Sequence, residues 1–440
     1  MSETDPEEYE LSDQEHEEIR DLLCLDHDEH ASAAEAADKS VTEMLRSPRL
    51  FVHLLSDIRR AGLIGESQNA LILWIAATSR LREKPLSVLV KGSSSAGKNH
   101  LVKSVLQFFP AEKVHEISSM SERSLNFVDG SRLENSILYF YEIGGRNRSM
   151  HPNRILISEG KLVHWYTRSA GGRRETRKEE TGGPVTCIST TTEDRLEVDD
   201  ESRHLSIWID ESDAQTKRIA KAYSAENAEF LHPATLLAWK RLQPVIRIPQ
   251  WFQRIVDIAL PIGDVRIRRY WPAFVEACKT VCLVRSFRWD DSELKEQGGL
   301  TVDFSDFAIT TLVFDKAISE SLCRNASEEE VRTKEMVTRI IENRGSSHGH
   351  VGVCAADLSY EPGVSSRDHA YRLLHRAERA GMLFRCNSPE KNNGKFYLPK
   401  LDSRFLGLPG YIFNSLDERM YAEFVNPFTD VRITFGQKKQ

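Results

Sequence analysis

The sequence contains no hydrophobic run long enough to cross a bilayer. Its longest apolar runs, such as Ala70–Trp74 and Val88–Val90, fall far short of the roughly 20 residues that a membrane-spanning helix needs. The acidic start of the chain also lacks the basic residues and the apolar stretch of a signal peptide. We therefore expect a cytoplasmic protein with no membrane partner.

Cysteine is scarce and shows no pairing pattern. Seven cysteines are scattered along 440 residues, and no two of them form a CxxC pair. Cys24, His27 and His30 have metal-like spacing, but no second ligand pair follows at a zinc-finger distance. The pattern argues against a disulfide framework and fits a reducing compartment.

Acidic and basic residues are unevenly distributed. Residues 1–40 carry 15 Asp and Glu against Arg20 and Lys39, a net charge of −13. Because the whole chain has a net charge of −7, the remaining 400 residues carry +6. We expect residues 1–46 to form an acidic, disordered tail. The mildly basic body is compatible with nucleic acid as a partner.

The periodicity of apolar residues divides the first half of the body into two parts. Residues 47–84 predict two helices that are broken near Gly62–Gly65. Residues 85–215 contain a short apolar strand before residue 92 and further strand candidates at 136–145, 184–192 and 204–210. Because these strands alternate with helices, we expect an α/β core with a parallel sheet covered on both faces.

The second half of the body is mostly helical. Residues 216–325 are assigned to a helical lid and a linker. Residues 326–400 show three helices and then a hairpin with "EKNNGK" at its tip, which is the plan of a winged helix-turn-helix domain. Residues 401–440 form an aromatic-rich C-terminal extension, whose candidate packing partner is this winged unit.

The motif GxxxxGK stands between a strand and a helix, the context that a phosphate-binding P-loop requires. Its glycines permit a turn that aims backbone N–H groups inward, and the helix N-terminus adds positive potential. Lys98 would reach the β- and γ-phosphates of ATP. The residues expected to hold the nucleotide are Gly92, Ser93, Ser94, Ser95, Ala96, Gly97, Lys98 and Asn99.

Two positions depart from the usual magnesium-binding pattern. Asn99 stands where a Ser or Thr hydroxyl ordinarily ligates Mg²⁺, although its amide oxygen is also an acceptable ligand. Glu142 follows an apolar strand and is the expected general base that activates water. With Asn99 it is also a candidate ligand of Mg²⁺. The position before it, where a metal-holding Asp often sits, is Tyr141. A slow or inactive ATPase is therefore an alternative.

Two further features follow the P-loop in the order expected of an ATPase. Thr190 and Thr191 end a strand in hydroxyls that are placed to sense the γ-phosphate. Arg203 stands just before the next strand, where an arginine of a ring ATPase reaches the nucleotide of the neighbouring subunit.

Together these motifs resemble the ring-forming AAA+ ATPases, and among them the minichromosome-maintenance-like helicases of bacterial mobile elements and phages. The resemblance covers roughly residues 60–290. It implies a homo-oligomeric ring, a hexamer, that uses ATP and Mg²⁺. It implies Thr190 or Thr191 as sensor 1, Arg203 as the arginine finger, and Arg266, Arg268 or Arg269 as the second sensor. We recognise no primase module in this sequence and therefore expect priming to come from a separate primase or polymerase.

Two basic segments are candidates for binding DNA. Residues 170–178, between the apolar stretches 162–166 and 184–188, read as the basic tip of a hairpin, and such a hairpin faces the central pore in the resembling helicases. The predicted helix at 365–381 carries arginines on one face, and the wing carries lysines. The candidate residues are Arg168, Arg173, Arg174, Arg177 and Lys178 in the hairpin, and Arg372, Arg376, Arg379, Lys391 and Lys395 in the winged unit.

Three functions remain open on this evidence. The first is an ATP-driven DNA helicase or translocase that acts in replication. The second is a nucleotide-binding initiator, loader or regulator with little or no ATP turnover, which the departures at Asn99 and Tyr141 favour. The third is a phosphotransferase, which would need neither DNA nor a winged helix.

Overall fold

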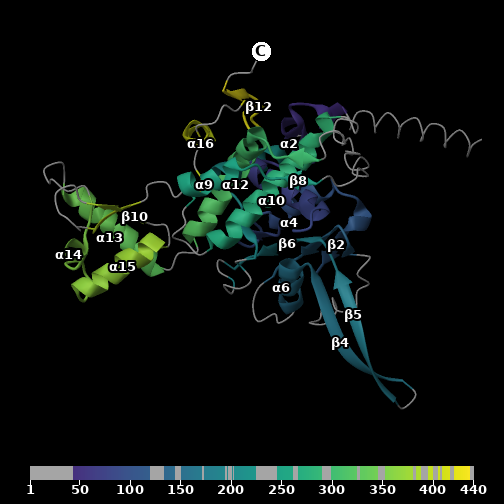
Figure 1. The fold of residues 1–440 in the computed structure, drawn as a ribbon, viewed down its shortest axis with the longest axis horizontal. Helices are drawn as coiled ribbons and strands as arrows, with labels where there is room; N and C mark the ends of the chain where they lie inside the picture. Colours follow the sequence, from purple (N-terminus) through teal and green to yellow (C-terminus); the bar gives the residue numbers. More distant parts are fainter. Residues whose placement is uncertain are drawn as a thin grey trace, which may run out of the picture.

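The computed structural model describes much of the body of the chain, and the predicted acidic tail up to residue 42 lies outside the described residues (Figure 1). None of the helices in the described part is both long and apolar enough to span a bilayer. The described residues are 43–118, 133–143, 150–170, 173–193, 196, 201, 203–223, 245–260, 266–289, 299–324, 328–344, 352–379, 383–387, 395–399, 405–406, 409–416 and 421–436.

Five parallel strands form the central sheet. β1 (Val88–Lys91), β3 (Ser136–Phe140) and β6 (Val185–Thr191) are buried along their whole length, as their apolar sequences predict. β2 (Val114–Ile117) and β7 (Leu205–Trp208) form the edges, and the strand order is β2-β3-β6-β1-β7. All neighbouring strands pair in parallel, which confirms the predicted α/β core.

Helices cover one face of this sheet. α3 (Ser67–Thr78) is apolar on nearly all sides and is buried throughout its last three-quarters, as expected of a helix inside a core. α2 (Leu50–Arg60) and α4 (Lys98–Leu106) pack beside α3 in the same apolar cluster. The break between α2 and α3 falls at Gly62 and Gly65, both with positive φ, where the sequence predicts it.

The opposite face carries α6 (Met150–Glu159), which packs on β4 and β6 in a second apolar cluster. β4 (Lys161–Ala170) and β5 (Arg173–Gly182) follow as an antiparallel hairpin, so a hairpin does form in the predicted segment. Its second strand is not the apolar stretch at 184–188, which enters β6, and the basic residues 173–178 therefore lie along β5 and not at the tip. At its base the Gly183 N–H donates to the Gly160 carbonyl, just before β6 begins. The hairpin therefore leaves the amino-terminal edge of the sheet and extends away from the body (Figure 1).

A helical part packs against α3 and β7. Its long helices α10 (Ile267–Arg285) and α12 (Phe304–Arg324) contact each other, and α12 also contacts β7. The ring of Phe307 lies edge-on to both Trp251 and Phe274, with centroids 5.7 Å apart in each pair. The remaining elements here are α8 (Asp213–Tyr223), β8 (Ile246–Arg247), α9 (Trp251–Ala259) and β9 (Leu300–Thr301).

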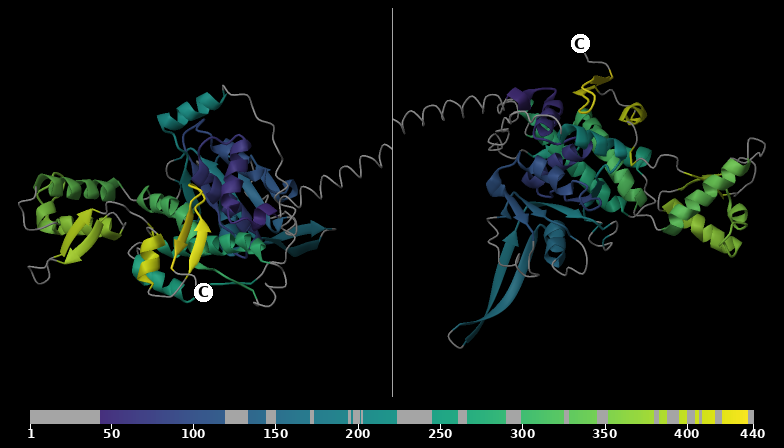
Figure 2. Two further views of the ribbon diagram at one scale, coloured as in Figure 1. Left: turned by 90° about the horizontal axis from the view of Figure 1, so that it is seen from above. Right: turned by 180° about the vertical axis from the view of Figure 1, so that it is seen from behind.

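The described residues of the C-terminal segment pack in the core of this helical part, and none of them belongs to the apolar core of the predicted winged unit. It forms α16 (Pro409–Ser415) and a hairpin of β12 (Ala422–Val425) and β13 (Arg432–Phe435), which lies against the helices (Figure 2). The Phe304 ring of α12 meets the rings of Phe413 and Phe435, with centroids 5.0 and 5.5 Å apart. The suggestion that residues 401–440 pack on the winged unit is wrong, because their aromatic side chains complete the core around α12.

Residues 328–399 form a unit with its own apolar core, which includes Val337, Leu374 and Tyr397. The order of its elements is the one that the sequence predicts, three helices and then an antiparallel pair of strands. These are α13 (Glu328–Arg344), α14 (Ala355–Leu358), α15 (Arg367–Arg379), β10 (Leu383–Asn387) and β11 (Lys395–Pro399).

Candidate functional site

The loop between β1 and α4 turns through two residues with a left-handed backbone. Ser95 and Gly97 have φ of +67° and +95°, and α4 begins directly after Gly97. A Cβ at Gly92 would lie 3.3 Å from Cβ of Ile209 and 3.0 Å from Oε1 of Glu211. The left-handed backbone thus favours glycine at position 97, and at position 92 the close approach of the segment after β7 leaves little room for a Cβ.

The loop presents backbone N–H groups that the protein itself does not use. Within the described part of the chain, no protein acceptor is found for the N–H groups of Ser94, Ser95, Gly97, Lys98 and Asn99. These donors lie at the N-terminus of α4, where the helix dipole favours negative charge. The loop therefore fits the phosphate groups of a nucleotide.

Lys98 is folded into the loop. Its buried Nζ donates to the carbonyl oxygens of Gly92 and Ser93, at 2.8 Å in each case. An ammonium has three donors, so one remains for a phosphate oxygen.

Asn99 connects α4 to two strands of the sheet. Its Oδ1 accepts hydrogen bonds from the Tyr139 hydroxyl of β3, at 2.9 Å, and from Thr190 Oγ1 of β6, at 3.3 Å. Burial raises the pKa of Tyr139, and the neighbouring Tyr141 and Glu116 raise it further. The phenol therefore stays protonated and remains a donor to Asn99.

Glu142 lies two residues beyond the end of β3, with a left-handed backbone at φ +44°. Its N–H donates to Thr190 Oγ1 at 3.0 Å, and its Oε1 accepts from the N–H and the hydroxyl of Thr192, at 2.8 and 2.6 Å. Within the described residues, its Oε2 has no protein donor. The hydrogen bonds to one oxygen thus orient the carboxylate. The other oxygen is available to a ligand at the carboxyl-terminal ends of the strands.

Of the predicted sensor threonines, Thr190 is the one that contacts this site. Thr191 is buried, and its Oγ1 accepts the Glu193 N–H at 3.1 Å. Thr192, which holds Glu142, was not assigned a role from the sequence. It belongs to the same run of hydroxyl residues, and that run was the only signal available.

Few protein ligands for magnesium are present. Tyr141, in the position of the missing Asp, donates its hydroxyl to Glu116 and packs against Lys103, whose Nζ is 5.3 Å from the ring centre. The described part of the chain has no group of three or more His, Cys, Asp or Glu that could hold a metal ion. Since the Asn99 oxygen already accepts two hydrogen bonds, the site fits phosphate groups better than a magnesium ion held by Asn99.

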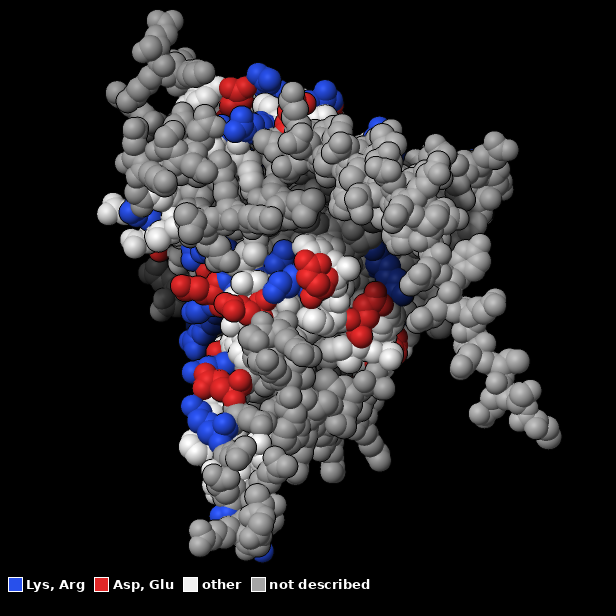
Figure 3. All heavy atoms as spheres, turned by 90° about the vertical axis from the view of Figure 1, so that its right-hand side faces the viewer, with Lys and Arg blue, Asp and Glu red and all other residues white. Residues whose placement is uncertain are grey.

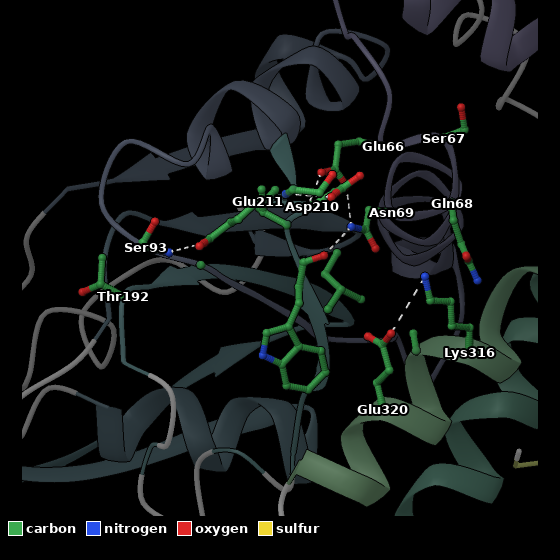
Figure 4. A pocket seen from close by; sticks show the side chains of 16 residues that line it. Glu66, Ser67, Gln68, Asn69, Ser93, Thr192, Asp210, Glu211, Lys316 and Glu320 are labelled. Atoms are coloured by element: carbon green, nitrogen blue, oxygen red, sulfur yellow. Dashed lines mark hydrogen bonds and ion pairs between the residues drawn. The ribbon is translucent and has the colours of Figure 1, made fainter. Parts of the chain in front are cut away.

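A cavity of about 760 Å³ adjoins the loop, within the usual size range of small-molecule pockets (Figure 4). Figure 4 shows Glu211 reaching toward Ser93, whose N–H donates to Glu211 Oε1 at 2.5 Å. The walls come from the start of α3, the loop, the end of β7 and α12. They include Glu66, Gln68, Asn69, Trp208, Asp210, Glu211, Lys316 and Glu320, none of which was assigned from the sequence.

Two carboxylates in the cavity wall are held by hydrogen bonds. Glu66 accepts from the Asp210 N–H at 2.7 Å and from Asn69 Nδ2 at 2.6 Å. Burial raises the pKa of Glu66, whereas hydrogen bonds from the hydroxyl and N–H of Ser212 lower the pKa of Asp210. This wall can accept hydrogen bonds from hydroxyl or amino groups of a ligand.

The predicted arginines lie away from the loop of their own chain. Arg203 Nε donates to Ser158 Oγ at 2.8 Å, near the end of α6 and the amino-terminal side of the sheet. Arg266 Nη2 donates to the Leu322 carbonyl of α12 at 2.8 Å, and Arg269 is exposed. Neither Arg266 nor Arg269 lines the cavity.

One face of the hairpin combines basic side chains with an exposed aromatic ring. Trp165 is 63% exposed and lies opposite Lys178, which pairs with Glu180 at 3.1 Å. Arg174 is exposed on the same face, and Figure 3 shows basic and acidic side chains along this element. The side chains of Arg168, Arg173 and Arg177 lie outside the described residues.

The predicted basic face of α15 is exposed. Arg372 and Arg376 face outward, while Leu373, Leu374 and Ala377 are buried in the unit's own core. Arg376 pairs with Glu329 of α13, at 2.5 Å. Lys395 Nζ donates to the Tyr371 hydroxyl at 3.3 Å. Lys391 and the side chain of Arg379 lie outside the described residues.

Comparison with known proteins agrees with this geometry. The family model described as "MTBMA_p00010 P-loop domain" matches residues 35–236, which include the loop, Glu142, Thr190 and Arg203. No curated protein matches the chain. The chain therefore contains a P-loop domain, and its five-stranded parallel sheet fits a P-loop NTPase core, which indicates nucleotide binding or hydrolysis.

Proposed function

We propose that this protein is a ring-forming AAA+ ATPase, similar to the minichromosome-maintenance-like helicases, that moves along DNA during replication of a mobile element. The observation that carries the proposal is the arrangement around Glu142. Thr192 fixes one carboxylate oxygen, and the other is available at the carboxyl-terminal edge of the sheet, where the P-loop also lies.

A carboxylate in this position suits a general base. Glu142 Oε2 can take a proton from a water molecule as that water attacks the γ-phosphate. Lys98 and the free N–H groups of the loop would hold the phosphates, and the cavity beside Ser93 would receive the nucleoside. Magnesium, when bound, neutralises charge on the phosphate oxygens.

The position of Arg203 supports a ring. It lies near the amino-terminal side of the sheet, by Ser158, whereas the P-loop follows the carboxyl-terminal end of β1. An arginine there can serve a neighbouring subunit's nucleotide. We propose a homo-oligomer, as a hexamer, that works with a separate primase or polymerase.

The hairpin and α15 are the proposed DNA contacts. The hairpin joins β6 directly, and β6 ends at Thr190 and Thr191 beside Asn99 and Glu142. Strand β6 therefore connects the hairpin to the nucleotide site, so a change at the nucleotide could move the hairpin along DNA. In the unit of residues 328–399, the order of helices and strands supports a winged helix-turn-helix.

The decisive experiment measures ATP hydrolysis by the purified protein with and without single-stranded DNA. We expect turnover that rises about tenfold or more on saturation with DNA, because a motor couples its two ligands. The Lys98→Ala variant sets the background from contaminating enzymes. Turnover with no response to DNA would contradict the motor and support a phosphotransferase.

The alternative is a nucleotide-binding initiator, loader or regulator with little turnover. Two observations favour it, the engaged oxygen of Asn99 and the tyrosine at position 141. In the same assay, nucleotide binding without hydrolysis on any DNA would establish this alternative.

A second prediction concerns the hairpin. The double variant Arg174→Ala/Lys178→Ala should reduce the slope of log affinity against log salt by about 1.4, since each phosphate contact on a single strand contributes about 0.7. Trp165→Ala should weaken binding about tenfold with an unchanged slope, because stacking on a base is not ionic. Fluorescence anisotropy with labelled oligonucleotide at several salt concentrations measures both.

The control for this prediction is Arg60→Ala on α2, an exposed cation away from the hairpin. It should leave both affinity and slope unchanged. Equal effects of the hairpin variants and of Arg60→Ala would show that the hairpin has no specific role in binding.

A further inference from the structure

We infer that Asn99 is a positioning residue for Glu142 and not a magnesium ligand. The inference rests on the function proposed above, in which Glu142 is the general base. It concerns the single departure from the P-loop motif, the amide at a position that ordinarily carries a hydroxyl.

The first argument is the hydrogen-bonding capacity of the amide oxygen. A carbonyl oxygen has two lone pairs, and both have a donor here, the Tyr139 hydroxyl at 2.9 Å and Thr190 Oγ1 at 3.3 Å. The oxygen would have to give up these bonds to bind a metal ion. Tyr139 is buried in β3, so its hydroxyl would then lose its acceptor at Asn99.

The second argument is the orientation of the Thr190 hydroxyl. Its single proton is directed to Asn99, so its lone pairs face the Glu142 N–H, which donates to it at 3.0 Å. Glu142 has φ of +44°, a conformation that non-glycine residues rarely adopt and that needs support from its surroundings. Asn99 thus supports the backbone of Glu142 through one intervening hydroxyl.

The third argument is reach. A Ser or Thr at position 99 would carry its oxygen on Cβ, one bond closer to the backbone of α4 than the oxygen of Asn99. The longer amide spans from α4 to the neighbouring strands β3 and β6 at once. The residue that replaces the hydroxyl therefore links the P-loop helix to the two strands that carry the catalytic carboxylate and its threonines.

The first test is steady-state hydrolysis at varied Mg²⁺ for the wild type, Asn99→Ala, Thr190→Val and the double variant. We expect Asn99→Ala to lower kcat about 100-fold, the loss that displacing a catalytic group by about 1 Å can cause. The KM for ATP and the Mg²⁺ concentration at half-maximal rate should change less than about twofold, and the double variant should be no slower than Thr190→Val alone. A tenfold rise in the half-maximal Mg²⁺ concentration, with kcat recovered at high Mg²⁺, would overturn the inference.

The second test does not need turnover. It compares the affinity of a fluorescent ATP analogue in Mg²⁺ with its affinity in EDTA, for the wild type, Asn99→Ala and Tyr139→Phe. We expect the same ratio of affinities in all three proteins, and loss of the Mg²⁺ effect in Asn99→Ala would overturn the inference. A wild type that binds without hydrolysing would refute the proposed motor, while this ratio would still decide whether Asn99 holds magnesium.

Discussion

The Glu142→Gln variant is expected to hydrolyse ATP about 1,000-fold more slowly than the wild type, within the range that a general base contributes. A glutamine oxygen can still accept the N–H and hydroxyl of Thr192, so the local structure should persist. The amide cannot take a proton from water. Affinity for a fluorescent ATP analogue should therefore stay within about twofold of wild type, and single-turnover hydrolysis should show the full loss.

The matched control is Glu116→Gln. Glu116 is an exposed carboxylate on β2, at the end of a neighbouring strand of the same sheet, and its contacts are to Tyr141 and Lys103. It should hydrolyse ATP at close to the wild-type rate. If both variants lost the same amount of activity, hydrolysis would depend on the total negative charge near the ends of these strands and not on Glu142 as a general base.

The Glu201→Gln variant is expected to lose about 3–5 kcal/mol of folding stability, the usual cost of breaking a buried ion pair. Glu201 pairs with Lys91, and the two side chains are only 7% and 2% exposed. Lys91 directly precedes the P-loop, and its Nζ lies 5.5 Å from the centre of the Trp208 ring. Without the carboxylate, the ammonium of Lys91 stays buried in a site that solvent does not reach. Urea denaturation followed by circular dichroism measures the loss.

Two comparisons make this prediction specific. The double variant Lys91→Met/Glu201→Leu should recover much of the stability, because replacing a buried pair by apolar side chains removes the cost of burying the charge. Glu180→Gln breaks the exposed pair with Lys161 on the hairpin and should change little. If Glu201→Gln is as stable as Glu180→Gln, the buried pair does not stabilise the P-loop strand.

The P-loop and the core strands could be predicted because their signals are local. An apolar run followed by small residues and GK specifies a strand, a turn and a helix N-terminus in one short stretch. Glu142 was predicted in the same way, from its place at the end of an apolar strand. A hairpin after residue 160 was also predicted, but its second strand was wrong, because residues 173–182 are too polar to read as a strand and the apolar stretch after them belongs to β6.

The partners of these residues could not be predicted, because they depend on the order of strands in the sheet. Asn99, Tyr139 and Thr190 are far apart in sequence, and they meet because β6 lies between β1 and β3. The packing of residues 405–435 was likewise missed, since the aromatic pattern of Phe413 and Phe435 does not reveal that Phe304 is their neighbour.

The amino-acid sequence by itself determined the phosphate loop, the parallel α/β core and the position of the carboxylate at the end of the second strand candidate, because strand and helix periodicity and loop chemistry act over a few residues. Only the tertiary structure decided what the departure at Asn99 does. A side-chain oxygen without hydrogen-bond donors would suit a metal ion. The oxygen of Asn99 instead accepts hydrogen bonds from the hydroxyls of Tyr139 and Thr190, and so helps to hold β3 and β6 in place. That difference arises from contacts between strands, which no local pattern records.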